Sequence, residues 1–273
     1  MNFLLIDCPN LCHRAYHTTG QLDQGTLFGF LRELDYLRKH YRDYRFLFFW
    51  DSKHPIRKQT FPDYKKSRAE KWQRLTDEEK SSYAQMRSEM ELLRREILWD
   101  LGYNNVRWQK GMEADDLIAA YTQQARDSTL TNDLIVSGDH DYYQCLSHRV
   151  SLLKPKGHVL YTAKDFRREY LIEPERWHCV KALAGCDSDD VPGVKGVGIA
   201  TAIQYLRGKL NPTWETAKRI EASKDIFNRN LGLVKLPLPG VKPFALKDDD
   251  ASHARWKSVL KNLGMKSLLG AFS

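Results

Sequence analysis

Three carboxylates, Glu113, Asp115 and Asp116, fall within four residues of this sequence, and an apolar helical pattern follows them directly. Acidic side chains in the first turn of a helix are stabilised by the positive end of the helix dipole, so helix capping alone explains such a cluster. Like charges a few ångströms apart also take up protons or bind cations. The choice between capping and a metal site therefore depends on the other carboxylates of the chain.

Several of those carboxylates follow short apolar segments that we predict to be β-strands. The segments, with their carboxylates, are NFLLID at 2–7 with Asp7, RFLFFWD at 45–51 with Asp51, and DLIVSGDHD at 133–141 with Asp139 and Asp141. Apolar strands without alternation, separated by helical segments, indicate a parallel sheet with helices on both faces. Because ligands of such sheets bind beyond the carboxyl ends of the strands, we expect these carboxylates at one edge.

An edge of carboxylates without histidine or cysteine suits a hard cation such as Mg²⁺ or Mn²⁺. Two such ions about 4 Å apart can hold the attacking and leaving oxygens of a phosphodiester. The sequence therefore predicts a metal-dependent phosphodiesterase, with capping as an additional role for Glu113.

A glycine-rich turn, GVKGVG at 193–198, precedes a second helical pattern through Ala200, Ile203 and Leu206. Such a turn exposes backbone N–H groups at a helix start, which suits a phosphate. The turn follows Asp187, Asp189 and Asp190 and lies between two helical segments, as in a helix–hairpin–helix. We therefore predict that DNA contacts come from Gly193, Lys195, Gly196 and Gly198, although a plain helix-to-helix turn has the same pattern.

The segment 62–100 begins with basic residues and continues as a helical pattern with Met86, Met90, Leu93 and Ile97 on one stripe. Charged helical segments are usually solvated faces. This one connects the Asp51 strand to the Glu113 cluster, so its basic start must lie near the predicted metal site. We expect cations here to neutralise a scissile phosphate and an aromatic ring to stack on a base. The candidates are Tyr64, Lys65, Lys66 and Arg68.

Composition agrees with a nucleic-acid partner. The 273 residues include 43 Lys and Arg against 35 Asp and Glu, a formal net charge of +8, which favours a polyanionic partner. The five cysteines are scattered and form no zinc motif, as expected for reduced thiols. No apolar run approaches the length of a membrane span. We expect a monomeric cytoplasmic protein, in the host cytoplasm if it is viral.

Together these motifs resemble the 5′-nuclease, or flap endonuclease, family, in particular the stand-alone bacteriophage enzymes and the 5′-nuclease domain of bacterial DNA polymerase I. The resemblance covers roughly residues 2–237 and rests on motifs in the family order: LLIDCPNLCHRAY, FFWDS, FPDYKKSR, GMEADDLIA, SGDHDYYQ and AGCDSDDVPGVKGVG. It implies an α/β core of the PIN-like type, with a mostly parallel sheet flanked by helices. It also implies a helical arch at about 62–100 within residues 1–173, and a helix–three-turn–helix region with a C-terminal helical segment within 174–273.

The resemblance further implies roles for single residues. Asp7, Asp51, Glu113, Asp115 and Asp116 match the first metal cluster and its surroundings, and Asp139, Asp141 and Asp189 match the second. Lys65 and Arg68 match the cations at the arch base that steer the scissile phosphate. Implied cofactors are Mg²⁺ at two sites, replaceable by Mn²⁺, and K⁺ at the Gly193–Gly198 turn. The implied activity is 5′–3′ exonuclease and flap endonuclease on 5′ flaps, overhangs or RNA–DNA hybrids in replication and repair, leaving 5′-phosphate and 3′-hydroxyl ends.

One position departs from the family pattern. The family reads Gly-Asp-x-x-Asp before its Pro-Gly turn, whereas this chain has Cys186 in place of the first Asp, with Asp189 retained. A thiol is a poor Mg²⁺ ligand, so we expect a weaker second ion, or Asp187 as a substitute ligand. Two alternatives remain open: a PIN-like ribonuclease, and a structure-specific DNA-binding protein with weakened nuclease activity.

Overall fold

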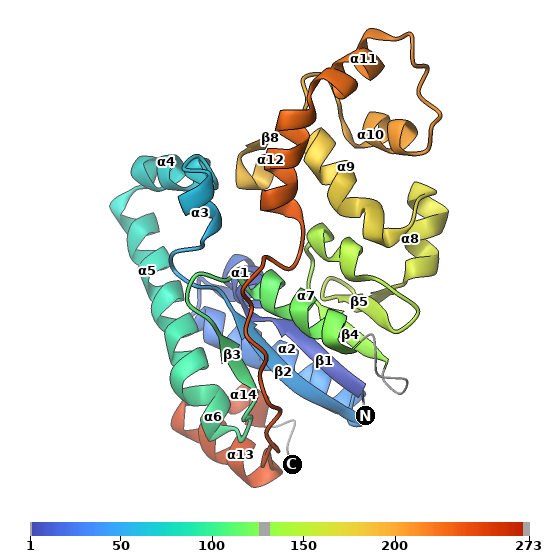
Figure 1. Ribbon diagram of the computed structural model, residues 1–273. Helices are drawn as coiled ribbons and strands as arrows, with labels where there is room; N and C mark the ends of the chain where they lie inside the picture. The colour runs from blue at the N-terminus through green and yellow to red at the C-terminus, as the bar shows by residue number, and fades with distance from the viewer. Residues whose placement is uncertain (1, 126–131, 270–273) are drawn as a thin grey trace.

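A six-stranded sheet forms the centre of the molecule in the computed structural model, which describes residues 2–125 and 132–269 (Figure 1). The order is β3-β2-β1-β4-β5-β6, and only β6 runs antiparallel to its neighbour. The strands are β1 (Asn2–Asp7), β2 (Tyr44–Trp50), β3 (Val106–Trp108), β4 (Asp133–Val136), β5 (Val150–Lys154) and β6 (Val159–Tyr161). The predicted mostly parallel sheet is confirmed, and β1 lies between the two other predicted strands.

Both faces of the sheet are covered, as the uninterrupted apolar strands require. Leu4 and Ile6 of β1 belong to a core with α1 (Cys8–Thr19), α2 (Gly25–His40) and α13 (His253–Asn262). Phe3 and Leu5 belong to the core on the other face, with α7 (Ala114–Ala125) and η2 (His140–Cys145). Each fully buried side chain of this kind stabilises the fold by about 1.5–3 kcal/mol.

The predicted arch segment lies between β2 and β3. Its helices are α3 (Arg57–Thr60), α4 (Lys66–Arg74), α5 (Asp77–Leu92), the π-helical turn η1 (Leu93–Ile97) and α6 (Leu98–Asp100). Helix α5 starts at a capping box formed by Thr76 and Glu79, which satisfies two backbone N–H groups. Met86, Leu93 and Ile97 are buried, so the predicted apolar stripe is confirmed there. The π-helical turn was not predicted.

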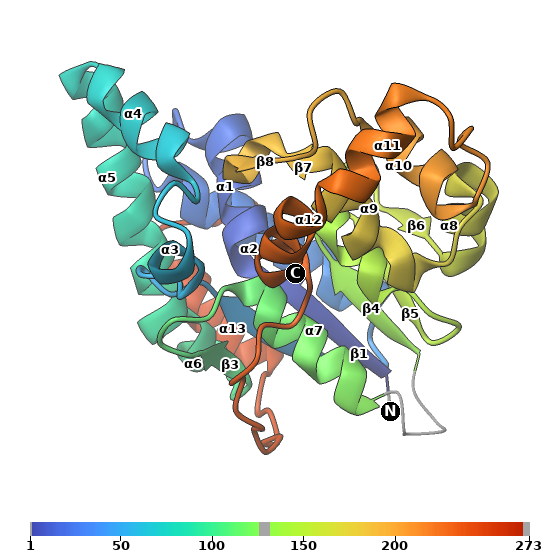
Figure 2. The same cartoon turned by 45° about the horizontal axis from the view of Figure 1, so that its top comes forward.

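A second group of helices lies across from the arch (Figures 1 and 2). It holds α8 (Ala163–Tyr170), η3 (Pro174–Arg176), α9 (Trp177–Ala184), α10 (Ile199–Leu206), α11 (Glu215–Ala222) and α12 (Lys224–Val234). Between α9 and α10 is a small hairpin of β7 (Gly185–Cys186), η4 (Asp187–Asp189) and β8 (Val191–Pro192). A Cβ atom on Gly193 would lie 2.3 Å from the carbonyl of Ala184, so this close approach requires glycine.

The chain then returns in extended form to α13 and α14 (Lys266–Leu269), beside α5 and α6 (Figure 1). The predicted division at residue 173 stays a prediction. Across residues 2–125 and 132–269, no helix combines the length and the hydropathy that a membrane span needs.

Candidate metal centre and nucleic-acid cleft

The carboxyl ends of β1, β2 and β4 open into a cleft of about 650 Å³. Five of the predicted carboxylates line this cleft: Asp7, Asp51, Glu113, Asp115 and Asp139. They meet because parallel strands end at the same edge and because α7 starts beside that edge. Their role as metal ligands stays a prediction, and the carboxylate oxygens that they offer suit Mg²⁺ or Mn²⁺.

The surroundings of three cleft carboxylates, Asp7, Asp51 and Asp115, raise their pKa values. Asp7 is 7% exposed, and its Oδ2 accepts hydrogen bonds from the Ser137 hydroxyl (2.9 Å) and the Tyr142 hydroxyl (3.1 Å). Burial, followed by the charge of Asp51, raises the pKa of Asp7 to about 7. Removal from water and the charge of Glu113 raise the pKa of Asp51, and burial raises that of Asp115. A bound cation would relieve this repulsion.

These shifts predict a pH-dependent response to metal. Since the pKa of Asp7 is higher folded (about 7) than its ordinary value of 3.8, the folded chain keeps a proton that the unfolded chain has lost between those pH values. The stabilisation that comes from protonated Asp7 is therefore lost as pH rises from about 4 to 7. A cation that binds the ionised Asp7 carboxylate restores stability. We expect Mg²⁺ to raise the melting temperature, measured against EDTA, more at pH 8 than at pH 5. Asp7→Asn should reduce that difference, and an equal Mg²⁺ effect at both pH values would contradict the interpretation.

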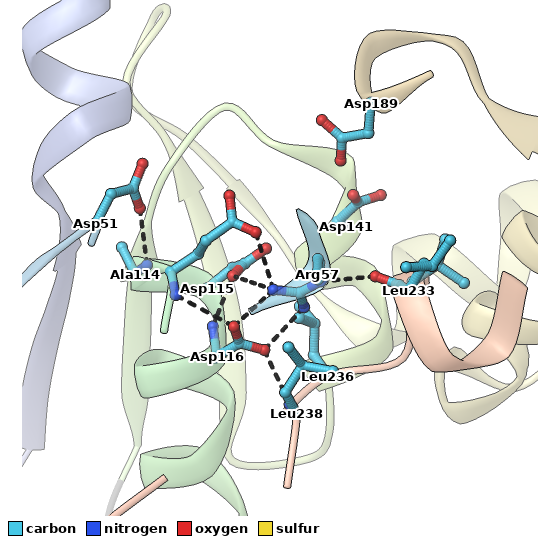
Figure 3. A network of polar contacts seen from close by, with 12 residues as sticks. Asp51, Arg57, Ala114, Asp115, Asp116, Asp141, Asp189, Leu233, Leu236 and Leu238 are labelled. Carbon is cyan, nitrogen blue, oxygen red and sulfur yellow. Dashed lines mark hydrogen bonds and ion pairs between the residues drawn. The ribbon is translucent and has the colours of Figure 1, made fainter. Parts of the chain in front are cut away.

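Arg57 of α3 binds residues at the start of α7 and in α12, so it holds three elements together at the site (Figure 3). The sequence analysis did not identify it as a site residue. Its guanidinium donates to both oxygens of Asp116 (2.6 and 2.8 Å) and to Glu113 Oε2 (2.9 Å). Its Nε donates to the Leu233 carbonyl (2.7 Å), and the Leu238 N–H donates to Asp116 (2.8 Å). Nothing in the spacing of Arg57 distinguishes it from the other basic residues of this segment.

This network gives Asp116 a structural role. The side chain is fully buried and is not part of the cleft lining, although one ligand atom each from Glu113, Asp115 and Asp116 lies within 4.8 Å of the others, and its place among the catalytic carboxylates stays a prediction. Asp116 balances the charge of Arg57 and fastens the start of α7 to the chain that follows α12.

The burial of Tyr64 argues against the base stacking that we predicted for it. The ring is 2% exposed and cannot stack on a base in this arrangement. Its hydroxyl donates to Glu113 Oε2 (3.0 Å) and to Asp189 Oδ2 (3.3 Å), so it connects carboxylates on opposite sides of the site. A buried hydroxyl needs such partners, which explains why a tyrosine occupies this position.

The Lys65 ammonium also connects Glu113 with Asp189, in this case through its positive charge. Its Nζ donates to Glu113 Oε1 and lies 3.6 Å from Asp189 Oδ1. Burial acts to lower the pKa of Lys65, but the charges of Glu113 and Asp189 outweigh it and raise the pKa, so the ammonium stays charged. The residue has a left-handed backbone (φ 55°), and its N–H donates to the Asp189 carbonyl (2.9 Å).

Replacing Lys65 tests its predicted role. We expect Lys65→Ala to lower kcat by about 10²–10³-fold, because a preorganised cation beside the reacting phosphate is lost. Single-turnover cleavage, with DNA affinity measured separately, distinguishes chemistry from binding. Lys58→Ala is the matched control, since Lys58 is exposed, does not line the cleft and is not among the predicted site residues. An effect on affinity alone would make Lys65 a phosphate anchor.

A second group of ligand atoms lies beside the first. One ligand atom each from Asp141, Cys186 and Asp189 lies within 4.8 Å of the others. Asp139, predicted for this group, lines the main cleft, where its Oδ1 accepts from the Asp141 N–H (2.9 Å). Asp187 is exposed and lies outside this group.

Another part of the cleft lining is basic and aromatic. It includes Lys71, Trp72 and Arg87 of the arch and His13 of α1, none of which was predicted as a site residue. The Arg87 guanidinium lies 4.6 Å from the centre of the Trp72 ring, a cation–π contact. Burial lowers the pKa of His13, and the nearby cations, Arg68 first, lower it further. This wall therefore offers positive charge to an anion in the cleft.

The glycine turn precedes a helix, as predicted, whereas its contact with DNA stays a prediction. Gly198 precedes α10 without a side-chain cap, so the first N–H groups of the helix are open to an anion. Gly196 has φ +76°, and the exposed Lys195 follows the tight approach at Gly193. The Lys195 carbonyl accepts a hydrogen bond from Arg219 (2.7 Å).

The sequence profile of the 5′–3′ exonuclease N-terminal, resolvase-like domain matches residues 2–171. This chain belongs to the 5′–3′ exonuclease family. It is 28% identical over 288 residues to the thermostable DNA polymerase I of Thermus aquaticus, covering 98% of this chain and 33% of that one. It is 26% identical over 251 residues to the 5′–3′ exonuclease of Buchnera aphidicola, covering 89% of this chain and 82% of that one.

Solved structures agree on the fold of this family member. The T5 5′-exonuclease with bound zinc superposes with a TM-score of 0.75 at 22% identity, covering 100% of this chain and 97% of the other. The bacteriophage T5 flap endonuclease with DNA and metal ions gives 0.72 at 21% identity, covering 100% and 96%. The chain spans only 11–33% of the length of the DNA polymerase I relatives.

Proposed function

We propose that this exonuclease-family chain is a metal-dependent 5′-nuclease that hydrolyses phosphodiesters near a 5′ single-stranded end of DNA. The observation that carries this proposal is the cleft itself, where five carboxylates face a basic and aromatic wall. Such a cleft suits an anionic strand that must reach a cation site. The relatives that are exonucleases, and the T5 structure with DNA and metal ions, support the same substrate class.

The residues then have distinct tasks. The five cleft carboxylates would hold Mg²⁺, which Mn²⁺ can replace; when bound, such an ion lowers the pKa of a water and neutralises charge on the phosphate. Lys65 and Arg68 would hold the scissile phosphate in place, close to Glu113 and Asp189. Tyr64 would keep that lysine and these carboxylates in position.

Binding of the duplex is proposed at the other helices. The open N–H groups at the start of α10 and the exposed Lys195 would hold one strand's phosphates. We retain K⁺ at this turn as part of the proposal, with one carbonyl already occupied by Arg219.

The finer expectations of the resemblance belong to this proposal as well. They are a monomeric enzyme of replication and repair, acting on 5′ flaps, overhangs or RNA–DNA hybrids and leaving 5′-phosphate and 3′-hydroxyl ends. Of the two divalent ions implied, the second would bind at Asp141 and Asp189, where Cys186 weakens it.

That weakened second group also favours one competing function, a DNA-binding protein with little nuclease activity. The test is cleavage of a 5′-labelled flap duplex and of its RNA-primed counterpart, titrated with Mg²⁺ and Mn²⁺. We expect cutting near the junction that EDTA abolishes. Tight binding without cutting in either metal would favour the competing function, and a strict preference for RNA would favour a ribonuclease.

A further inference from the structure

The second group of ligand atoms already contains a cation that the sequence analysis did not consider. Lys181 lies on α9, and its Nζ is 2.9 Å from Asp141 Oδ1, with each of the two side chains 15% exposed. The charge of Lys181 also acts on the Cys186 thiol. The ammonium therefore pairs with one of the three residues that would surround a second metal ion and lies near another.

The third residue of the group is engaged as well. Asp189 pairs with Arg68 (3.0 Å) and with Lys65 (3.6 Å), and it accepts a hydrogen bond from Tyr64 (3.3 Å). The two carboxylates of the group thus face three cationic side chains, of which Lys65 is shared with Glu113. A divalent ion here would have to displace cationic partners that already offset much of the charge that attracts it.

The remaining ligand is unsuited to a hard ion. Cys186 is 3% exposed, and its sulfur lies 3.2 Å from the Ser188 hydroxyl. Thiol sulfur is a poor ligand for Mg²⁺, which prefers oxygen and near-octahedral geometry. The donor set therefore does not fit the second Mg²⁺ that the family resemblance implies.

We infer that the Lys181 ammonium occupies the second cation position of the free protein, so that the chain binds one divalent ion tightly and a second only weakly. Lysine supplies a compact charge on a flexible stem, which suits a position beside Asp141 at the edge of this group. The inference deepens the proposed function, on which it rests, because it states how many ions the same site retains without DNA.

The test counts Mn²⁺ bound to the full-length, metal-free chain without DNA, from the loss of the electron paramagnetic resonance signal of aqueous Mn²⁺. We expect one tight ion in the wild type and a second at least about 10-fold weaker, the scale of effects from residues around metal ligands. Cys186→Asp combined with Lys181→Met should bring the second ion to within about 10-fold of the first. Two equally tight ions in the wild type, or a single ion in both proteins, would overturn the inference.

A matched control is Cys179→Asp, which adds the same charge as Cys186→Asp but on α9, the helix that carries Lys181. Cys179 is half-buried, and the charges that act on it come from Arg176 and Lys235, away from Asp141. Cys179→Asp should leave the number of tightly bound Mn²⁺ ions at one.

Two single variants keep the inference testable where the double variant fails to fold, as judged by its melting temperature. Lys181→Met should strengthen the second ion, whereas Lys181→Arg, which retains the charge, should not; equal behaviour of the two would contradict the inference. Absence of any bound Mn²⁺ would contradict the proposed function instead, so the two failures are distinguishable.

Discussion

Asp115→Asn is expected to lower kcat for cleavage of a 5′-flap duplex by about 10³-fold or more, while DNA affinity stays within about two-fold. Asp115 is in the first turn of α7, its side chain is 25% exposed, and it lines the cleft. Losing a charged ligand removes several kcal/mol of charge stabilisation in the transition state, and about 1.4 kcal/mol corresponds to ten-fold in rate. Single-turnover rates at saturating Mg²⁺ and binding measured in EDTA separate the two quantities.

The control is Asp225→Asn, which removes a carboxylate from the first turn of a different helix, α12, on the surface. Its rate should match the wild type. Asp139→Asn should behave like Asp115→Asn, because both side chains line the same cleft. Unchanged turnover in either cleft variant would remove that residue from the proposed site.

The largest expected effect on stability is that of Arg57→Met. The guanidinium is 2% exposed and contacts Asp116, Glu113 and the Leu233 carbonyl. Removing it leaves two buried carboxylates without their cation, and breaking a buried pair in this way costs about 3–5 kcal/mol. We expect this decrease in the free energy of unfolding, measured by urea denaturation in EDTA.

Two comparisons test the cause of this decrease. Arg68→Met removes an exposed guanidinium that pairs with Asp189, and such pairs contribute about 0–1 kcal/mol. Arg57→Lys keeps the charge but loses the two parallel bonds to Asp116, so its effect should be intermediate. A decrease below about 1 kcal/mol for Arg57→Met would mean that Asp116 and Glu113 are balanced by other groups.

The sheet and its acidic edge were predictable from the sequence. Continuous apolar strands need cover on both faces, and parallel strands place their carboxyl ends together, so Asp7, Asp51 and Asp139 had to meet. Glu113 and Asp115 reach the same edge because α7 begins there. The short strands β3, β5 and β6 were missed, since three to five residues give little periodicity.

The packing of distant elements, in contrast, settles which polar groups face the cleft and which are enclosed. Asp115 and Asp116 are adjacent and identical in type, yet one lines the cleft while the other is buried against Arg57. Tyr64 and Lys181 likewise acquired their partners from segments far away in the chain. Charge pairing across a fold depends on the distances between elements, and these distances leave no trace in local spacing, composition or periodicity.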